Sequence, residues 1–256
     1  MSLFNKIFAS VGIGAATVDT KIEKSTIIPG EIVKGEIDVQ GGSIEQKIDS
    51  IYLSLYTTYI KEVDDKKYSS SGLIDGFRIA ESFQLQPNER KVLPFSFQLP
   101  IDTPITIGRT KIWVSTGLNI KNAVDPNDKD YLKIMPTPLM SSVLQAISDL
   151  GFRLREAECE EAPYRLRNRF PFVQEFEFVP AAGSFKGRLD ELEMIFYPKS
   201  SHEIELLIQV DRRASGLGGF LSEALEMDET NVKITVSSAD ISIMKDKMKS
   251  VIQAYC

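Results

Sequence analysis

The sequence is poor in the residues that build metal and redox sites. Its 256 residues include one histidine, His202, and two cysteines, Cys159 and Cys256. Two distant cysteines cannot form a disulfide framework and lack the spacing of zinc ligands, which fits a reducing compartment. A histidine-dependent triad would have to use His202, which follows Pro198 in a predicted exposed turn. We therefore expect no metal, no cofactor and no catalytic residues, and a protein that is not an enzyme.

Basic charge and long apolar runs are also missing. Thirty lysines and arginines stand against 36 aspartates and glutamates, for a formal net charge of −6. Nucleic-acid binders need a basic surface to neutralise phosphates, so nucleic acid is not an expected partner. No apolar run approaches the roughly 20 residues that span a bilayer. The N-terminus carries no clear processing site, so the expected location is the cytoplasm.

Nucleotide-binding and hydrolase motifs are absent as well. There is no G-x-S-x-G, and the segment DRRASGLGGF at residues 211–220 matches neither G-x-G-x-x-G nor G-x-x-x-x-G-K-[ST]. This segment follows a predicted strand and opens a predicted helix, so it is either a structural connection or a loop whose N–H groups capture an anion or a partner. The residues of this candidate partner-binding loop are Asp211, Arg212, Arg213, Gly216, Gly218 and Gly219.

Alternation of apolar and polar residues is what the sequence has in abundance. The clearest strand runs from Ile51 to Val63 and is rich in aromatic and β-branched residues. Short strands at regular spacing predict β-sandwiches. Pro94, inside one of these segments, marks an edge strand or a strand start. The other predicted strands lie at 18–36 (two strands), 77–85, 91–99, 111–116, 152–159, 164–169, 171–179, 188–197, 203–210 and 231–237.

One amphipathic helix is predicted between two strand-rich blocks. Thr137 can cap its first turn, Pro138 suits the first helical position and Gly151 can close its end. Apolar residues recur between them at steps of three and four, so one face must be buried. The expected organisation is an N-terminal β-sandwich with a short N-terminal helix (1–136), a connecting helix (137–151), a C-terminal β-sandwich (152–238) and a helical tail (239–256).

Both ends of the chain predict amphipathic helices, at residues 3–11 and 241–255. Such helices can dock on the body, bind a partner or lie on a membrane, and a short helix with one positive charge binds lipid weakly. They support an alternative function, a peripheral membrane-associated sensor.

Three sets of charged residues have simple expected roles. Glu175 and Glu177 share a strand face, a spacing that could serve acid–base chemistry on a sugar in a hydrolase but that in a sandwich usually marks the solvated side, where we expect them. Arg165, Arg167 and Arg169 alternate along a predicted strand and are expected to pair with neighbouring glutamates, such as Glu175 and Glu177, across the sheet. Residues 119–130, with several aspartates, lack the calcium-loop pattern and predict a turn.

Two segments carry a family resemblance. PGEIVKGEIDVQGG, from Pro29, and LPFSFQLPIDTP, from Leu93, resemble the N-terminal sandwich of arrestin-like proteins. Together with residues 190–197 and the segment DRRASGLGGFLSEALEMDE, they make the chain similar to the bacterial sporulation-control protein M family, from near Phe4 to about Ser237.

The resemblance implies a mainly β fold, an arrestin-like tandem of two β-sandwiches with a connecting helix and a C-terminal helix. It implies a non-enzymatic, cytoplasmic regulator of sporulation and stress development that acts as a protein-interaction scaffold. The implied partners are other proteins, with cell-division and cytoskeletal proteins among the candidates, and membrane contact is weak or indirect. The oligomeric state is left open, with a dimer as one option.

Overall fold

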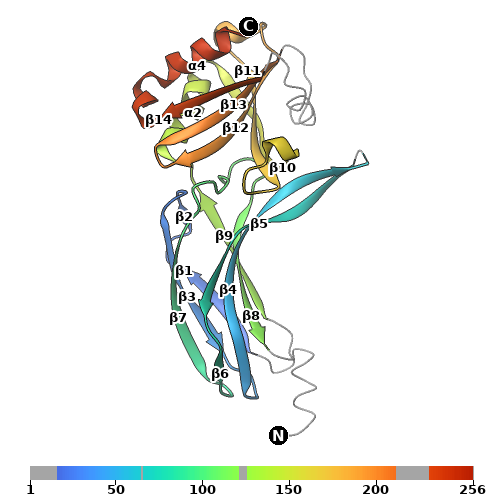
Figure 1. Cartoon of the computed structure of the whole chain (residues 1–256), viewed down its shortest axis with the longest axis vertical. Helices are drawn as coiled ribbons and strands as arrows, with labels where there is room; N and C mark the ends of the chain where they lie inside the picture. Colours follow the sequence, from blue (N-terminus) through green and yellow to red (C-terminus); the bar gives the residue numbers. More distant parts are fainter. Residues whose placement is uncertain (1–15, 65, 121–125, 212–230, 256) are drawn as a thin grey trace. The chain divides into compact units, whose positions relative to one another are not determined.

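The computed structural model describes residues 16–64, 66–120, 126–211 and 231–255, and these are mainly β-strands (Figure 1). The chain forms two compact units. Unit 1 comprises Met1–Thr57, Leu73–Pro100 and Ile112–Lys133, and unit 2 comprises Thr58–Gly72, Ile101–Lys111 and Ile134–Cys256. The expected mainly β fold, with a helix between strand-rich parts and a C-terminal helix, is confirmed.

The two units differ from the domains expected from the sequence at two segments. Residues 58–72 and 101–111 come from the first half of the chain but belong to unit 2. The physical reason is backbone pairing with a strand of the second half. Ile60 pairs with Glu160, and the Arg109 N–H donates to the Ala157 carbonyl at 3.1 Å.

Unit 1 contains two sheets. The smaller sheet is antiparallel, with Pro94 on its edge strand, as expected. Its strands, in order, are β1 (Thr17–Ile22), β3 (Ile32–Gln40) and β7 (Arg90–Gln98). The other sheet is built from β4 (Gln46–Val63), β8 (Ile112–Ile120), β9 (Asn127–Ile134) and β2 (Thr26–Ile27), with β5 (Lys66–Ala80) and β6 (Phe83–Leu85) paired to β4.

Alternating side chains build the core of unit 1. Ile37 of β3 and Leu53 of β4 are fully buried. The two sheets meet where Thr20 of β1 and Thr116 of β8 share a hydrogen bond of 2.5 Å between their hydroxyl oxygens. Gly35 is needed in this core, because a Cβ there would lie 2.4 Å from the Lys21 carbonyl oxygen. β9 was not predicted, since residues 119–130 were expected to form a turn.

Unit 2 is built on an antiparallel sheet with the order β14, β13, β12, β11, β10. Figure 1 shows helices α2 and α4 lying side by side next to this sheet, and α2 also contacts β10 and β13. The helices therefore form a second layer in unit 2. The elements are α2 (Pro138–Asp149), β10 (Phe152–Glu161), η1 (Tyr164–Leu166), β11 (Phe172–Pro180), η2 (Gly183–Phe185), β12 (Glu191–Ser200), β13 (Glu203–Asp211), β14 (Asn231–Ser237), η3 (Ser238–Ile243) and α4 (Met244–Gln253).

The connecting helix α2 begins and ends where the sequence predicts. The Thr137 hydroxyl accepts a hydrogen bond from the Met140 N–H at 3.2 Å, and Pro138 is the first helical residue. Gly151 has a φ of +94°, a conformation that glycine adopts without strain. The apolar face is buried, with Val143 and Ile147 fully inaccessible.

The C-terminal helix α4 docks on the body of unit 2. Its buried residues, Met244, Met248 and Ile252, recur at four-residue steps, and α4 packs against α2. These three side chains are therefore not available to a membrane or a partner, whereas Ile241 and Tyr255, near the ends of the predicted helix, are exposed. The predicted N-terminal helix at 3–11 lies outside the described residues. In the described part of the chain, no helix has the length and apolarity needed to cross a membrane.

If α2 holds unit 2 together, shortening its buried face will destabilise the protein. Ile147→Ala is expected to lower the free energy of unfolding by about 2–5 kcal/mol, because it removes buried methyl groups and leaves a cavity. Gln145→Ala, on the exposed face of the same helix, is the matched control. Urea unfolding followed by circular dichroism measures both, and equal midpoints would contradict the packing role.

Candidate functional site

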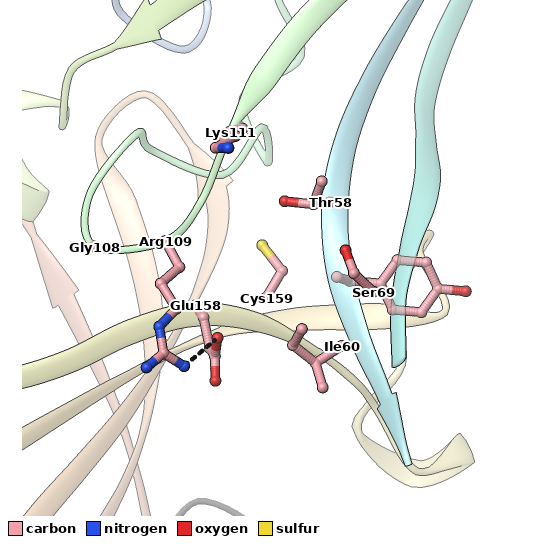
Figure 2. Close-up of a pocket in the computed structure, with 9 residues that line it drawn as sticks. Thr58, Ile60, Ser69, Gly108, Arg109, Lys111, Glu158 and Cys159 are labelled. Atoms are coloured by element: carbon pink, nitrogen blue, oxygen red, sulfur yellow. Dashed lines mark hydrogen bonds and ion pairs between the residues drawn. The ribbon is translucent and has the colours of Figure 1, made fainter. Parts of the chain in front are cut away.

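A pocket of about 490 Å³ lies in unit 2 (Figure 2). Three parts of the chain that are far apart in sequence form it: the paired strands β4 and β5, the segment 108–111, and strand β10. The lining residues are Thr58, Tyr59, Ile60, Ser69, Gly108, Arg109, Lys111, Glu158 and Cys159.

The pocket exists because β4 and β10 pair at one point and are bridged by a third segment. The parallel pairing recorded between them joins Ile60 to Glu160. Next to this point, the Thr58 N–H donates to the Lys111 carbonyl at 3.4 Å, and the Arg109 N–H donates to the Ala157 carbonyl at 3.1 Å. Segment 108–111 thus spans the two strands and closes one side of the pocket.

Gly108 permits the close approach of this segment to β10. Its φ is +60°, and a Cβ at this position would lie 2.2 Å from the Ala157 carbonyl oxygen. Any other residue would push the segment away from the strand. The glycine is therefore required for the shape of the pocket.

Charged groups line one side of the pocket. The Arg109 guanidinium lies 2.6 Å from a Glu156 carboxylate oxygen and 3.4 Å from one of Glu158. Glu158 is buried, whereas the Arg109 side chain is 71% exposed. The arginine therefore neutralises a buried carboxylate and still presents donors to solvent. Lys111, also exposed, adds a second cation.

The described residues of the pocket include a thiol and hydroxyls but no arranged pair of nucleophile and base. Figure 2 shows the Cys159 sulfur and the Thr58 hydroxyl directed toward the space between β4 and segment 108–111. Cys159 is 2% exposed, and its sulfur lies 4.0 Å from the Thr110 hydroxyl oxygen. Among the described residues, no group of three or more His, Cys, Asp or Glu side chains could hold a metal ion.

Buried carboxylates extend from the pocket across the unit 2 sheet. Glu158 pairs in register with Glu175, and Glu156 with Glu177, which in turn pairs with Glu193 on β12. Glu175, Glu177 and Glu193 are each 1% exposed. The expectation that Glu175 and Glu177 face solvent was wrong, because both side chains are buried.

The arginine that compensates these charges is not one that the sequence suggested. Arg155 lies at a β-bulge in β10 and forms ion pairs with Glu177 and Glu191, the latter at 2.7 Å. A bulge re-aims a side chain, which brings Arg155 to these carboxylates.

Arg165, Arg167 and Arg169 were expected to pair with neighbouring glutamates. Arg167 does pair with a neighbouring glutamate, but this is Glu161, at 3.6 Å, instead of Glu175 or Glu177. Arg165 lies in the 3₁₀ helix η1 instead of a strand, so the three residues do not alternate on a sheet face. The Arg167 Nε donates to the Ala162 carbonyl at 2.6 Å, and Arg169 forms an ion pair with Asp102 at 2.8 Å.

Burial changes the acidity of this carboxylate face. It raises the pKa of Glu160 from 4.5 to about 6, although Lys67, at 3.4 Å, opposes the shift. Burial also raises the pKa of Glu175 well above its ordinary value, with the nearby charges of Glu160 and Glu191 adding to the effect. Both carboxylate oxygens of Glu175 lack a hydrogen-bond partner in the described chain. Ionised carboxylates here therefore cost stability.

The other residues singled out in the sequence lie elsewhere. His202 is exposed in a turn, as predicted, with its Nδ1 3.3 Å from the Ser238 hydroxyl oxygen. Asp211 is the last residue of β13 and pairs in register with Glu191. The remaining residues of the candidate partner-binding loop, Arg212, Arg213, Gly216, Gly218 and Gly219, lie outside the described residues.

The raised pKa of Glu160 predicts a specific pH dependence. The folded chain holds the Glu160 proton more tightly than the unfolded chain, so this stabilisation is complete below about pH 4.5 and is lost as the pH rises through about 6. Glu160→Gln keeps the side chain neutral. It should raise the free energy of unfolding by about 2 kcal/mol at about pH 7.5 and change it little at about pH 4.5.

Urea unfolding at the two pH values tests this prediction. Glu203→Gln, at an exposed position on the same sheet, is the control and should change stability little at either pH. Equal effects of Glu160→Gln at both pH values would show that burial does not perturb this carboxyl.

Comparison with known proteins identifies the family of this chain. The Spo0M family, described as SpoOM protein, matches residues 4–214. The sporulation-control protein spo0M of Bacillus subtilis (strain 168) is 43% identical over 258 residues, covering 100% of this chain and 99% of that protein. The crystal structure of Spo0M, sporulation control protein, from Bacillus subtilis matches with a TM-score of 0.89 and 42% identity, over 95% of this chain and 100% of that one. The chain therefore belongs to the Spo0M family of sporulation-control proteins.

Proposed function

We propose that this chain is a non-enzymatic, cytoplasmic regulator of sporulation that acts by binding other proteins. The observation that carries the proposal is the likeness to a sporulation-control protein along the whole chain, at 43% identity. The likeness includes both compact units, since the matching crystal structure covers 95% of this chain. A regulator that serves as a scaffold needs surfaces that bind partners and no reacting groups.

The pocket beside Cys159 has the properties of such a binding surface. Arg109 and Lys111 present cations at its edge, where a carboxylate of a partner can pair with them. Glu158 shares the Arg109 guanidinium with Glu156, and this ion pairing disfavours a role as a general base. The pocket therefore suits recognition of an acidic side chain better than chemistry on a substrate.

The segment 211–219 is a second proposed contact, on the strength of its sequence. Arg212 and Arg213 follow β13 and precede several glycines. An arginine pair is suited to carboxylate capture.

The alternative of a membrane-associated sensor loses one of its two helices. Met244, Met248 and Ile252 of α4 are buried in unit 2. The remaining support is the sequence of residues 3–11, so liposome flotation of the full chain and of a chain lacking these residues separates the two functions. Flotation that is lost on trimming would favour the sensor.

Charge reversal at the pocket tests the proposed function. In a spore-forming strain that lacks its own copy, the unaltered chain should restore normal sporulation, while Lys111→Glu should restore it several-fold less well. Repulsion of an acidic partner is the reason. Lys34→Glu, at an exposed position in unit 1, is the control and should behave like the unaltered chain.

Two further measurements make the result interpretable. Circular dichroism should show that Lys111→Glu is folded, and affinity capture from sporulating cells should show loss of a saturable protein partner. The combined change of Arg212→Glu and Arg213→Glu tests the second contact in the same way. Full sporulation and unchanged partners in both variants would contradict binding at these surfaces.

A further inference from the structure

The outward face of β4, β8 and β9 in unit 1 is lined with aromatic residues. Tyr56, Trp113 and Tyr131 pair in register across the three strands, so their rings form one row. The Tyr56 and Trp113 rings are stacked with centroids 5.7 Å apart, and the Trp113 and Tyr131 centroids are 6.2 Å apart. Tyr131 is 57% exposed, whereas Trp113, between the two tyrosines, is 6% exposed. Solvated faces of antiparallel sheets usually carry polar side chains, so the exposed tyrosines of this face call for an explanation.

A hollow lies beside the aromatic row. It has a volume of about 270 Å³, with Ser54, Ser115 and Gly117 at its centre and Tyr52 and Tyr56 among its other lining residues. Gly117 leaves the space open, since a Cβ there would meet no atom within 4 Å. The two tyrosines stand four residues apart on β4, a distance of about 13–14 Å along a strand. The Tyr52 side chain is 42% exposed, so the hollow is accessible.

Lys129 places a positive charge on this face, although the chain as a whole is acidic. The Lys129 Nζ lies 3.9 Å from the Trp113 ring centroid and 4.9 Å from that of Tyr131. The neighbouring Asp128 lies on the opposite face, where its carboxylate accepts a hydrogen bond from the Thr20 N–H at 2.7 Å. The residues of β8 and β9 that pair in register with Tyr52, Ser54 and Tyr56 carry no carboxylate. They are Gly117, Ser115, Trp113, Asn127, Lys129 and Tyr131.

We propose that this face binds an extended, proline-containing segment of a partner protein that carries an acidic residue next to the proline. Proline-rich segments form the polyproline II helix and dock on aromatic-lined grooves, where their flat rings lie against aromatic side chains. At about 3.1 Å per residue, four or five residues of such a segment span the distance between Tyr52 and Tyr56.

The polar side chains that line the hollow can bind the backbone carbonyl groups of such a segment. A polyproline II segment offers carbonyl groups that need donors, and its prolines have no N–H to satisfy. The hydroxyls of Ser54 and Ser115 and the amide of Asn119 are donors that line the hollow. Lys129 then supplies the partner for an acidic residue. The inference rests on the proposed role in protein binding but uses a surface in unit 1 that is separate from the pocket beside Cys159.

A displayed library of random peptides, selected on the immobilised full chain, tests this proposal. Tyr52→Ala serves for counter-selection, because Tyr52 is exposed and its truncation should leave the fold intact. The expected outcome is enrichment of peptides with proline next to aspartate or glutamate. Peptides without proline, or no enrichment over Tyr52→Ala, would overturn the proposal.

Trp113 provides a direct readout, since it is the one tryptophan of the chain. A selected peptide should change its fluorescence saturably, and Tyr52→Ala should weaken binding by about tenfold or more. Lys129→Glu should reverse the preference from acidic to basic peptides. Tyr68→Ala, at an exposed tyrosine in unit 2, is the matched control and should bind normally.

The outcomes separate this inference from the proposed function. Partners captured from cells that depend on Lys111, together with no peptide binding at Tyr52, would sustain the proposed function and reject the inference. A Tyr52-dependent fluorescence change caused by an oligosaccharide, with none caused by peptides, would also reject it, because it would assign the face to a different class of ligand.

Discussion

The alternation of side chains along β4 is the constraint on which both proposed surfaces depend. The inward residues of this strand, such as Leu53 and Leu55, are fully buried in unit 1, and this burial fixes which side chains face outward. Tyr52 and Tyr56 are therefore held on the solvated face without any special support. The last residues of the same strand belong to unit 2, where Thr58 and Ile60 line the pocket.

Unit 2 combines apolar packing, which stabilises the fold, with buried carboxylates, which destabilise it. The helices α2 and α4 bury apolar side chains against each other, and burial of one such side chain contributes about 1.5–3 kcal/mol. The buried carboxylates of the sheet oppose this gain, since burial of an ionised group without full compensation destabilises the fold. Arg155 and Arg109 offset part of the cost by pairing with Glu177 and Glu158. The free energy gained by burying apolar side chains of the helices thus offsets the destabilisation caused by the buried carboxylates of the sheet.

The sequence was sufficient where the determining signals are local. The ends of α2 were predicted from Thr137, Pro138 and Gly151, because capping acts within one turn. The sequence was insufficient where a residue far away in the chain determines whether a strand forms or a side chain is buried. The glutamate pattern of β11 is the same for a solvated and a buried face, and the difference lies in what covers it. β9 was missed because its inward Asp128 is satisfied by Thr20, more than a hundred positions away. The pocket has no motif, since its three segments meet only in the folded chain.

The central proposal is that this member of the Spo0M family acts by binding other proteins. The most direct measurement places a photoreactive amino acid at position 111 and, separately, at position 34, in sporulating cells, and identifies the cross-linked products by mass spectrometry. The account predicts a defined protein adduct at position 111 that is absent at position 34. No protein adduct at position 111, or the same adducts at both positions, would contradict it.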